Sequence, residues 1–68
     1  MNEIVFKVED AAEGGWAACA LGESIFIQAD TREMLRENVR DAVRCHFEEE
    51  TAPKVIRLHF VHDELISV

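Results

Sequence analysis

The sequence predicts an α+β fold with the order β-β-β-α-β, in which one helix packs on a four-stranded mixed sheet. Three short segments within residues 3–29, and a fourth after residue 53, alternate apolar and polar side chains with the two-residue period of strands. Between them, residues 35–47 carry apolar side chains at three- and four-residue spacing, which is the period of a helix. A chain of 68 residues has room for one such domain, residues 1–68.

The first three strands form a predicted meander that is joined by glycine turns. Alternation predicts the strand Glu3–Glu9, and Gly14-Gly15 supplies the positive φ angles that a hairpin connection can require. The second strand is predicted at Trp16–Leu21. Gly22-Glu23 then reverses the chain again, and the third strand is predicted at Ser24–Ala29.

The helix has the clearest pattern in the sequence. Asp30 is in place to cap its first turn, with Glu33 reaching back as in a capping box. Thr51-Ala52-Pro53 is expected to end it, because proline cannot continue the backbone hydrogen bonds of a helix. Arginines and acids at three- and four-residue spacing occupy the polar face. The apolar stripe consists of Leu35, Val39, Ala42, Val43, His46 and Phe47.

The last predicted strand, Lys54–His62, returns parallel to the first strand through a right-handed crossover, which gives the strand order 3-2-1-4. The segment Leu65–Val68 either extends this strand or pairs with a partner. One helix covers only one face of such a sheet. The residues expected to face the helix are Ile4, Phe6, Val8, Ile25, Ile27, Ile56, Leu58 and Phe60.

The uncovered face of the sheet is the predicted partner surface. Val5, Phe26, Val55 and Val61 fall on it, and an exposed apolar patch of this kind is typical of an interface. Trp16 is a fifth candidate, because tryptophan is enriched at interface hot spots, although the edge of the core is the favoured position for this side chain. Some of the second-strand residues Ala17, Cys19 and Leu21 are expected on this face as well.

The charge of the chain restricts its partners. Fourteen acidic and seven basic residues give a net charge of −7, and five of the seven net negative charges lie in residues 1–30. Such a charge opposes sequence-independent binding to nucleic acid or to an anionic membrane. It favours a basic protein partner or serves only solubility. We find no signal peptide or membrane span in the sequence, so a cytoplasmic location is expected.

A core of this size is only marginally stable without further support. Cys19 and Cys45 are too few for a disulfide framework and are expected to be buried, inert thiols. Self-association into a dimer or tetramer through the uncovered face or the edge strands is therefore expected.

No catalytic, metal-binding or cofactor-binding residue is predicted. His59 and His62, three residues apart on a strand, point to opposite faces and do not chelate one metal ion. His46, on the apolar stripe, is expected at the edge of the core with a hydrogen bond to the backbone. The sequence contains no nucleophile and base in a known order, no phosphate-binding glycine loop and no zinc signature.

Three motifs carry a resemblance to a known family: Gly-Gly-Trp-Ala-Ala at residues 14–18, Gln-Ala-Asp-Thr-Arg-Glu-Met-Leu at residues 28–35, and Asn-Val-Arg-Asp-Ala-Val at residues 38–43. With them the chain, over about residues 3–62, resembles the HicB-like antitoxin family, whose N-terminal domain has a partial RNase H-like fold. The resemblance implies a protein that neutralises a small basic HicA-like mRNA-cleaving toxin by covering its surface, and that forms dimers or tetramers.

Two features depart from that family. Its Pro-Gly-Cys segment between the second and third strands is replaced by Ala20–Ser24. The C-terminal DNA-binding module of full-length members is absent from these 68 residues, so direct binding to nucleic acid is not expected.

Two alternatives stay open at this point. The first is a standalone oligomeric regulatory or ligand-sensing module without a toxin partner. The second and weaker one is a degenerate RNase H-like hydrolase, which would need carboxylates on the first strand, the helix and the fourth strand to hold magnesium ions. The core-facing and central positions of the first strand are Ile4, Val5, Phe6 and Val8, so catalysis is not expected.

Overall fold

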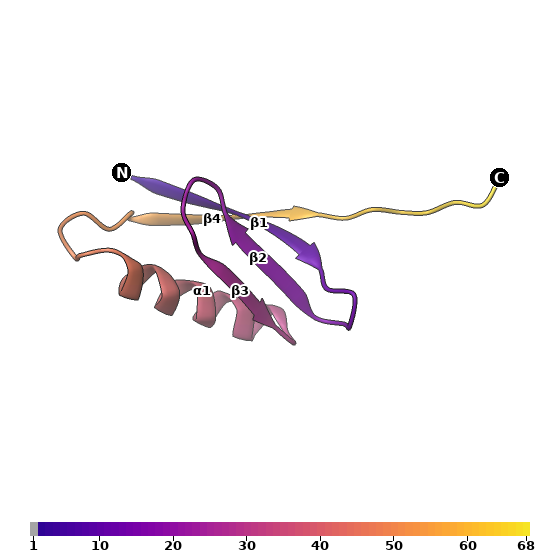
Figure 1. The fold of residues 1–68 in the computed structure, drawn as a ribbon, viewed down its shortest axis with the longest axis horizontal. Coiled ribbons are helices and arrows are strands. Elements are labelled where there is room, and N and C mark those ends of the chain that lie inside the picture. Colours follow the sequence, from indigo (N-terminus) through magenta and orange to yellow (C-terminus); the bar gives the residue numbers. More distant parts are fainter. Residues whose placement is uncertain (1) are drawn as a thin grey trace.

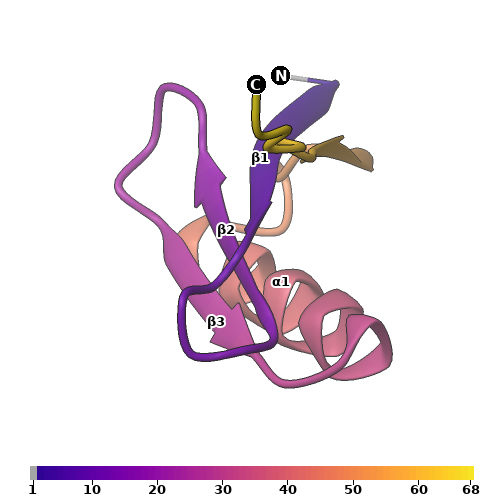
Figure 2. The ribbon, with the colours of Figure 1, turned by 90° about the vertical axis from the view of Figure 1, so that its right-hand side faces the viewer.

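A computed structural model of the chain describes residues 2–68 (Figure 1). Its elements are, in chain order, β1 (Glu3–Asp10), β2 (Trp16–Ala20), β3 (Phe26–Ala29), α1 (Arg32–His46) and β4 (Val55–Val61). The predicted α+β order is therefore confirmed. Figure 2 shows α1 on one side of the sheet, with the other side left uncovered.

The sheet has the strand order β3-β2-β1-β4, which confirms the predicted order 3-2-1-4. β1 pairs antiparallel with β2, β2 pairs antiparallel with β3, and β4 lies parallel to β1. Residues that lie opposite each other in this register share a face of the sheet. Phe6, for example, lies between Ala20 of β2 and Leu58 of β4. β3 and β4 are the two edge strands.

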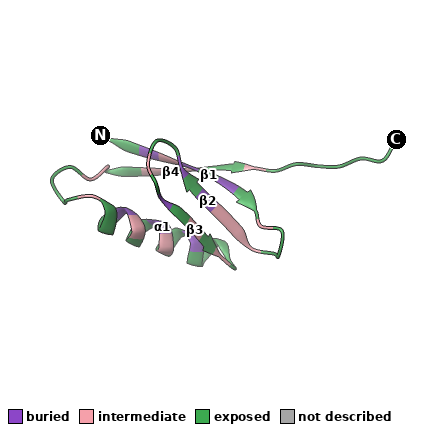
Figure 3. Cartoon of the chain, viewed as in Figure 1, coloured by how far each residue is buried: buried purple, intermediate pink, exposed green. Residues whose placement is uncertain are grey.

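The core lies between α1 and the sheet (Figure 3). Phe6 and Leu35 are its largest fully buried side chains, and no polar side chain among residues 2–68 is buried. Burying a large apolar side chain contributes about 1.5–3 kcal/mol, so this cluster is what holds α1 on the sheet. The buried residues are Ile4, Phe6, Val8, Ala18, Ala20, Ile25, Leu35, Val39 and Val43.

The helix does not sit centrally on the sheet. Its contacts with the sheet are mainly with β3 and β2. On β4, Ile56 and Leu58 are half-buried, and Phe60 is exposed over 37% of its surface. Phe60 thus lies on the predicted face of the sheet, opposite Val8, but α1 reaches it through the Arg32 side chain and does not bury it.

The cap of α1 differs from the prediction by one residue. Thr31, not Asp30, is the N-cap, and its extended backbone lets its Oγ1 accept a hydrogen bond from the Met34 amide at 3.1 Å. Both residue types are good caps, so the sequence pattern does not distinguish them.

The helix also ends earlier than predicted. Its last residue is His46, and Phe47 is already extended (φ −113, ψ 152), well before Pro53. Two causes favour the early end. Phe47 packs against the core, and the three acids Glu48-Glu49-Glu50 would place negative charge on the negative end of the helix dipole. A turn follows instead, in which the amides of Thr51 and Ala52 donate to the Glu48 carbonyl.

The strand ends differ from the prediction by one or two residues. β2 ends at Ala20 instead of Leu21, and β3 begins at Phe26 instead of Ser24. Backbone hydrogen bonds nevertheless continue past these ends, because the Ala20 amide donates to the Ile25 carbonyl and the Leu21 amide to the Val5 carbonyl. Ile25 is buried although it lies outside β3.

Beyond β4 the chain continues as an extended segment, residues 62–68, which we call the tail. It projects from the body of the domain (Figure 1), and the molecule measures 52 Å along its longest axis but only 20 and 18 Å along the others. At its start, His62 Nδ1 lies 3.1 Å from Asp10 Oδ2, beyond the last paired residues of β1 and β4. Leu65, Ile66 and Val68 are exposed.

Candidate protein interface

The face of the sheet opposite α1, which we call the open face, is the candidate functional site. Strand alternation places the side chains between the core residues of each strand on this face. The register then groups them across the sheet, with Glu3 beside Val55, Val5 beside Arg57, and Cys19 beside Phe26. Its members are Glu3, Val5, Lys7, Glu9, Ala17, Cys19, Phe26, Gln28, Val55, Arg57, His59 and Val61.

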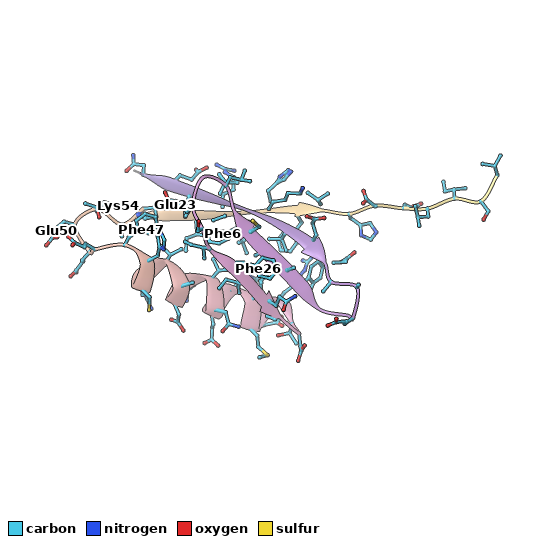
Figure 4. All side chains as sticks on the ribbon, viewed as in Figure 1. Phe6, Glu23, Phe26, Phe47, Glu50 and Lys54 are labelled. Atoms are coloured by element: carbon cyan, nitrogen blue, oxygen red, sulfur yellow. The ribbon has the colours of Figure 1, made fainter. Side chains whose placement is uncertain are left out.

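The apolar residues of the open face are spread over all four strands. Phe26 on β3 is exposed over 62% of its surface and Val55 on β4 over 54%, while Val5 and Val61 are half-buried. Figure 4 labels Phe26 and, for comparison, the buried Phe6. No element among residues 2–68 covers this face. A partner that removes a side chain as large as Phe26 from water lowers the free energy of the complex.

The polar side chains of the open face pair with one another. Arg57 donates from Nε to Glu3 Oε1 at 2.7 Å and from Nη2 to Glu3 Oε2 at 3.1 Å, which is a two-bond pair across β4 and β1. These hydrogen bonds, followed by the charge of Arg57, hold the pKa of the Glu3 carboxyl below its usual value. Lys7 Nζ lies 3.5 Å from Glu9 Oε1. The formal charges on this face therefore balance.

The acids of the meander lie mostly outside the open face. Asp10 and Glu13 belong to the end of β1 and its loop, Glu23 to the loop before β3, and Asp30 to the connection into α1. These acids lie at the ends of the strands and in the loops, and none of them lies among the apolar residues of the open face. The negative field of these acids extends beyond the open face, which itself is largely apolar and charge-balanced.

Trp16 lies apart from the other four candidate interface residues. It is on the helix side of the sheet, half-buried and packed against the core, which confirms the interpretation as a core-edge residue. Its ring meets Phe60 edge to face at 5.5 Å, and the Arg32 guanidinium lies 4.9 Å from the Trp16 ring and 4.5 Å from the Phe60 ring. Val5, Phe26, Val55 and Val61 share the open face, and Trp16 does not.

His46 and both cysteines lie differently from the predictions. His46 Nε2 lies 3.0 Å from Glu23 Oε1, in the loop before β3, instead of bonding to the backbone. Cys19 and Cys45 are free thiols and both are exposed, so the prediction of buried thiols is wrong. Cys19 is on the open face, and Cys45 is exposed on α1, where it lines a shallow pocket with Ala42 and Ile25.

Residues 2–68 bring no three side chains of histidine, cysteine, aspartate or glutamate together in a way that could hold a metal ion. No helix in this part of the chain has the length and hydrophobicity that crossing a membrane requires.

One group was missed by the sequence interpretation. Arg32, Arg36, Arg40 and Arg44 recur every four residues and thus form one row on α1, where the sequence predicted pairing with helix acids. Within residues 2–68 the helix shows one such pair, Arg44 Nη1 with Asp41 Oδ1 at 3.8 Å. The exact four-residue spacing was the signal in the sequence.

The motifs that carry the family resemblance meet in space. Gly15 has φ +81, and a Cβ at that position would lie 2.5 Å from the Ala29 carbonyl oxygen, so the Gly-Gly-Trp turn packs directly on the end of β3. Thr31 of the second motif caps α1. These motifs therefore maintain the fold where hairpin, third strand and helix meet.

The chain is similar to small curated proteins that are called UPF0150 protein. The one from Thermotoga maritima is 46% identical over 67 residues, which cover 98% of this chain and 94% of that protein. The one from Archaeoglobus fulgidus is 52% identical over 55 residues, which cover 81% of this chain and 82% of that protein. No family model and no solved structure matches the chain.

Proposed function

This chain belongs to the UPF0150 family, and from that premise we propose that it is a noncatalytic interaction protein of the HicB-like antitoxin type. In this role it binds and neutralises a small basic HicA-like toxin that cleaves mRNA. The observation that carries the proposal is the open face. A folded domain that exposes Phe26 and Val55 on an uncovered sheet has a surface suited to a protein partner.

The distribution of charge supports a basic partner. The chain carries −7, and the acids of the meander surround a contact surface whose own charges balance. Attraction between a basic toxin and this field would speed association, and salt would slow it. The apolar residues would then supply affinity at the centre of the contact, and the Glu3–Arg57 pair would lie among them.

The proposal assigns no catalytic group to the chain. β1 presents Ile4, Val5, Phe6 and Val8 where an RNase H-type nuclease would place a metal-binding carboxylate. The absence of catalysis is tested by a nuclease assay in the presence of magnesium. The purified protein is expected to leave RNA intact. Nuclease activity that Asp10→Asn or Asp30→Asn abolishes would contradict the proposal.

The direct test of function is inhibition of a HicA-like toxin, for which the first source is a neighbouring reading frame that encodes a basic chain of similar size. The toxin is mixed with RNA and increasing amounts of this protein. We expect cleavage to stop near one equivalent. Phe26→Asp is expected to weaken inhibition at least about tenfold, since it replaces the largest exposed apolar side chain of the open face with a charge.

Met34→Asp is the matched control for that variant. Met34 is also an exposed apolar residue, at 47%, but it is on α1 away from the open face. Inhibition by Met34→Asp should equal that of the unmodified protein. Equal inhibition by Phe26→Asp would remove the open face from the account, and no inhibition by any form would favour a standalone oligomeric regulatory module.

A further inference from the structure

A groove runs between α1 and β4 on the helix side of the sheet, where the off-centre helix leaves β4 uncovered. Two adjoining pockets form it, and Arg40 and Ile56 line both of them. Its floor is apolar and its rim is basic. The residues that line the groove are Arg36, Val39, Arg40, Val43, Arg44, Ala52, Pro53, Lys54, Val55, Ile56 and Leu58.

The basic rim is unusual in a chain of net charge −7. Within residues 2–68, neither Arg36 nor Arg40 forms an ion pair, and both side chains are exposed. Both line the half of the groove whose floor includes Leu58. The groove therefore fits an extended segment that combines apolar side chains with a carboxylate.

The outer edge of β4, beside the groove, can in addition pair with a segment that lies there. β4 pairs with β1 on one side and has no strand on the other, so a row of backbone amides and carbonyls is open along Val55–Val61. An open edge of this length is a template for an added strand. β3, the other edge strand, is only four residues long.

The tail has the complementary composition. It is extended, it carries the acids Asp63 and Glu64, and its apolar residues are bare: Leu65 is 96% exposed and Ile66 79%. Its seven residues span about 23 Å when extended, which is the length of the seven-residue β4. At the start of the tail His62 contacts Asp10, and the tail continues along the line of β4, away from its own groove (Figure 1).

We propose that the tail of a second copy of this chain pairs antiparallel with the outer edge of β4, and that the two copies exchange tails reciprocally. Each tail would then lie along the mouth of the other copy's groove. The proposal rests on the open edge, on the match between acids of the tail and arginines of the groove, and on the exposed apolar residues of both.

The alternation of side chains restricts the register. Ile56 and Leu58 face the groove, so the tail residues that lie opposite them face it too. With Ile66 opposite Ile56, Glu64 falls opposite Leu58, next to Arg36 and Arg40. The same register places Asp63 opposite His59 on the other face and puts Val61 of the two copies on the symmetry axis. Shifting by two residues would instead place Glu64 against the Phe60 ring.

The resulting dimer is one continuous sheet with both helices on the same side. Both open faces lie on the other side and remain accessible, and in this register Asp63 and Leu65 of each tail lie on that side, opposite His59 and Arg57 of the other copy. The proposal is thus independent of toxin binding, and the dimer would present two open faces together.

The test is a charge exchange followed by sedimentation equilibrium of the full chain. Glu64→Arg and Arg40→Glu each place like charges together in both tail contacts, so each variant alone should dimerise at least about tenfold more weakly. In a mixture of the two variants, each contact of the mixed dimer again joins opposite charges. The mixture should therefore associate about as strongly as the unmodified protein. Glu37→Arg, a charge reversal at an exposed position of α1 that does not line the groove, is the control and should not change association.

Three results would overturn the proposal. One is an unmodified protein that stays monomeric at about 100 µM, where an interaction of useful strength is populated. Another is Glu64→Arg protein that dimerises as strongly as the unmodified chain. The third is a mixture no tighter than its components, which would mean that the tail folds onto its own copy or that another surface joins the copies. Circular dichroism checks that each variant is folded, and Ile66→Asp serves as a second tail variant that should also weaken the dimer.

Discussion

Thr31 fixes the start of α1 through one side-chain hydrogen bond. Its Oγ1 accepts from the Met34 amide, one of the four amides in the first turn that have no partner within the helix. Asp30, directly before it, is equally suited by residue type but is not the cap. The two residues therefore offer a matched comparison.

We predict that Thr31→Ala lowers the free energy of unfolding by about 1 kcal/mol, the usual cost of losing an N-cap side chain. Asp30→Ala should cost only a few tenths of a kcal/mol, the size of a favourable charge near the positive end of the helix. Urea unfolding of both variants gives the two values. A larger cost for Asp30→Ala would mean that Asp30 is the cap.

The Glu3–Arg57 pair is the best-formed ion pair of the open face, and it makes a prediction about pH. Arg57 holds the pKa of Glu3 below its usual value. A carboxyl whose pKa is lowered by folding contributes stability above its unfolded pKa, and this contribution is lost as the pH falls through the folded pKa. The contribution is therefore complete at neutral pH and disappears in the acidic range.

We expect NMR titration of the Glu3 carboxyl to give a midpoint below that of an ordinary glutamate. Arg57→Gln should return the midpoint toward the ordinary value, because it removes both the hydrogen bonds and the charge. Arg32→Gln removes the same charge at the other end of the sheet, where Arg32 lies over Trp16 and Phe60, and should leave the midpoint unchanged. An unshifted midpoint in the unmodified protein would show that the pair does not form in solution.

Among the elements, the β1–β2 hairpin is held by glycines with different surroundings. Gly14 and Gly15 both have positive φ, at +96 and +81. A Cβ on Gly14 would meet nothing within 4 Å, whereas one on Gly15 would press on the Ala29 carbonyl at the end of β3. Glycine is therefore required at position 14 only by the backbone conformation of the turn. At position 15 it is also required by the close packing of the hairpin on β3.

Gly14→Ala should therefore cost about 1–2 kcal/mol of unfolding free energy, which is the cost of a left-handed backbone for a residue with a Cβ. Gly15→Ala should cost distinctly more, because backbone must move as well. Urea unfolding compares them under identical conditions. Equal costs would indicate that the hairpin and the end of β3 are not in close contact.

Much of the element order could be predicted from periodicity, because alternation records which side chains must be buried. Ile4, Phe6 and Val8 on one face of β1, with Val5 on the other, predict both the core and the open face. The end of α1 could not be predicted in this way. Residues 47–50 still fit the helical pattern, and the helix ends where the packing of Phe47 and the three acids outweigh it.

The surroundings of the cysteines and of the arginine row depend on where α1 sits, which no local pattern records. Cys45 precedes His46, which the apolar stripe of the sequence includes. A small rotation of the helix about its axis decides whether the Cys45 thiol is buried or exposed. The preference of α1 for β3 and β2 likewise creates the groove beside β4. Residue types predicted the open face, but only the three-dimensional arrangement brings the arginines to the uncovered strand.

At the scale of the whole molecule, one helix has to stabilise a sheet of four strands, and two surfaces remain. The open face is apolar and charge-balanced, and we assign it to a basic partner. The α1–β4 groove is apolar and basic, and we assign it to the acidic tail of a second copy. Apart from Val55, at the start of β4, which borders both, the two surfaces lie on opposite sides of the sheet, so both can be occupied at the same time.

The most direct test of the central claim is to map the surface that a toxin contacts. The backbone amides of isotope-labelled protein are followed by NMR while an unlabelled HicA-like toxin is added to one equivalent. The account predicts that the resonances that shift or broaden belong to the open face, centred on Val5, Phe26, Val55 and Val61. Changes confined to α1, or none at equimolar toxin, would contradict it.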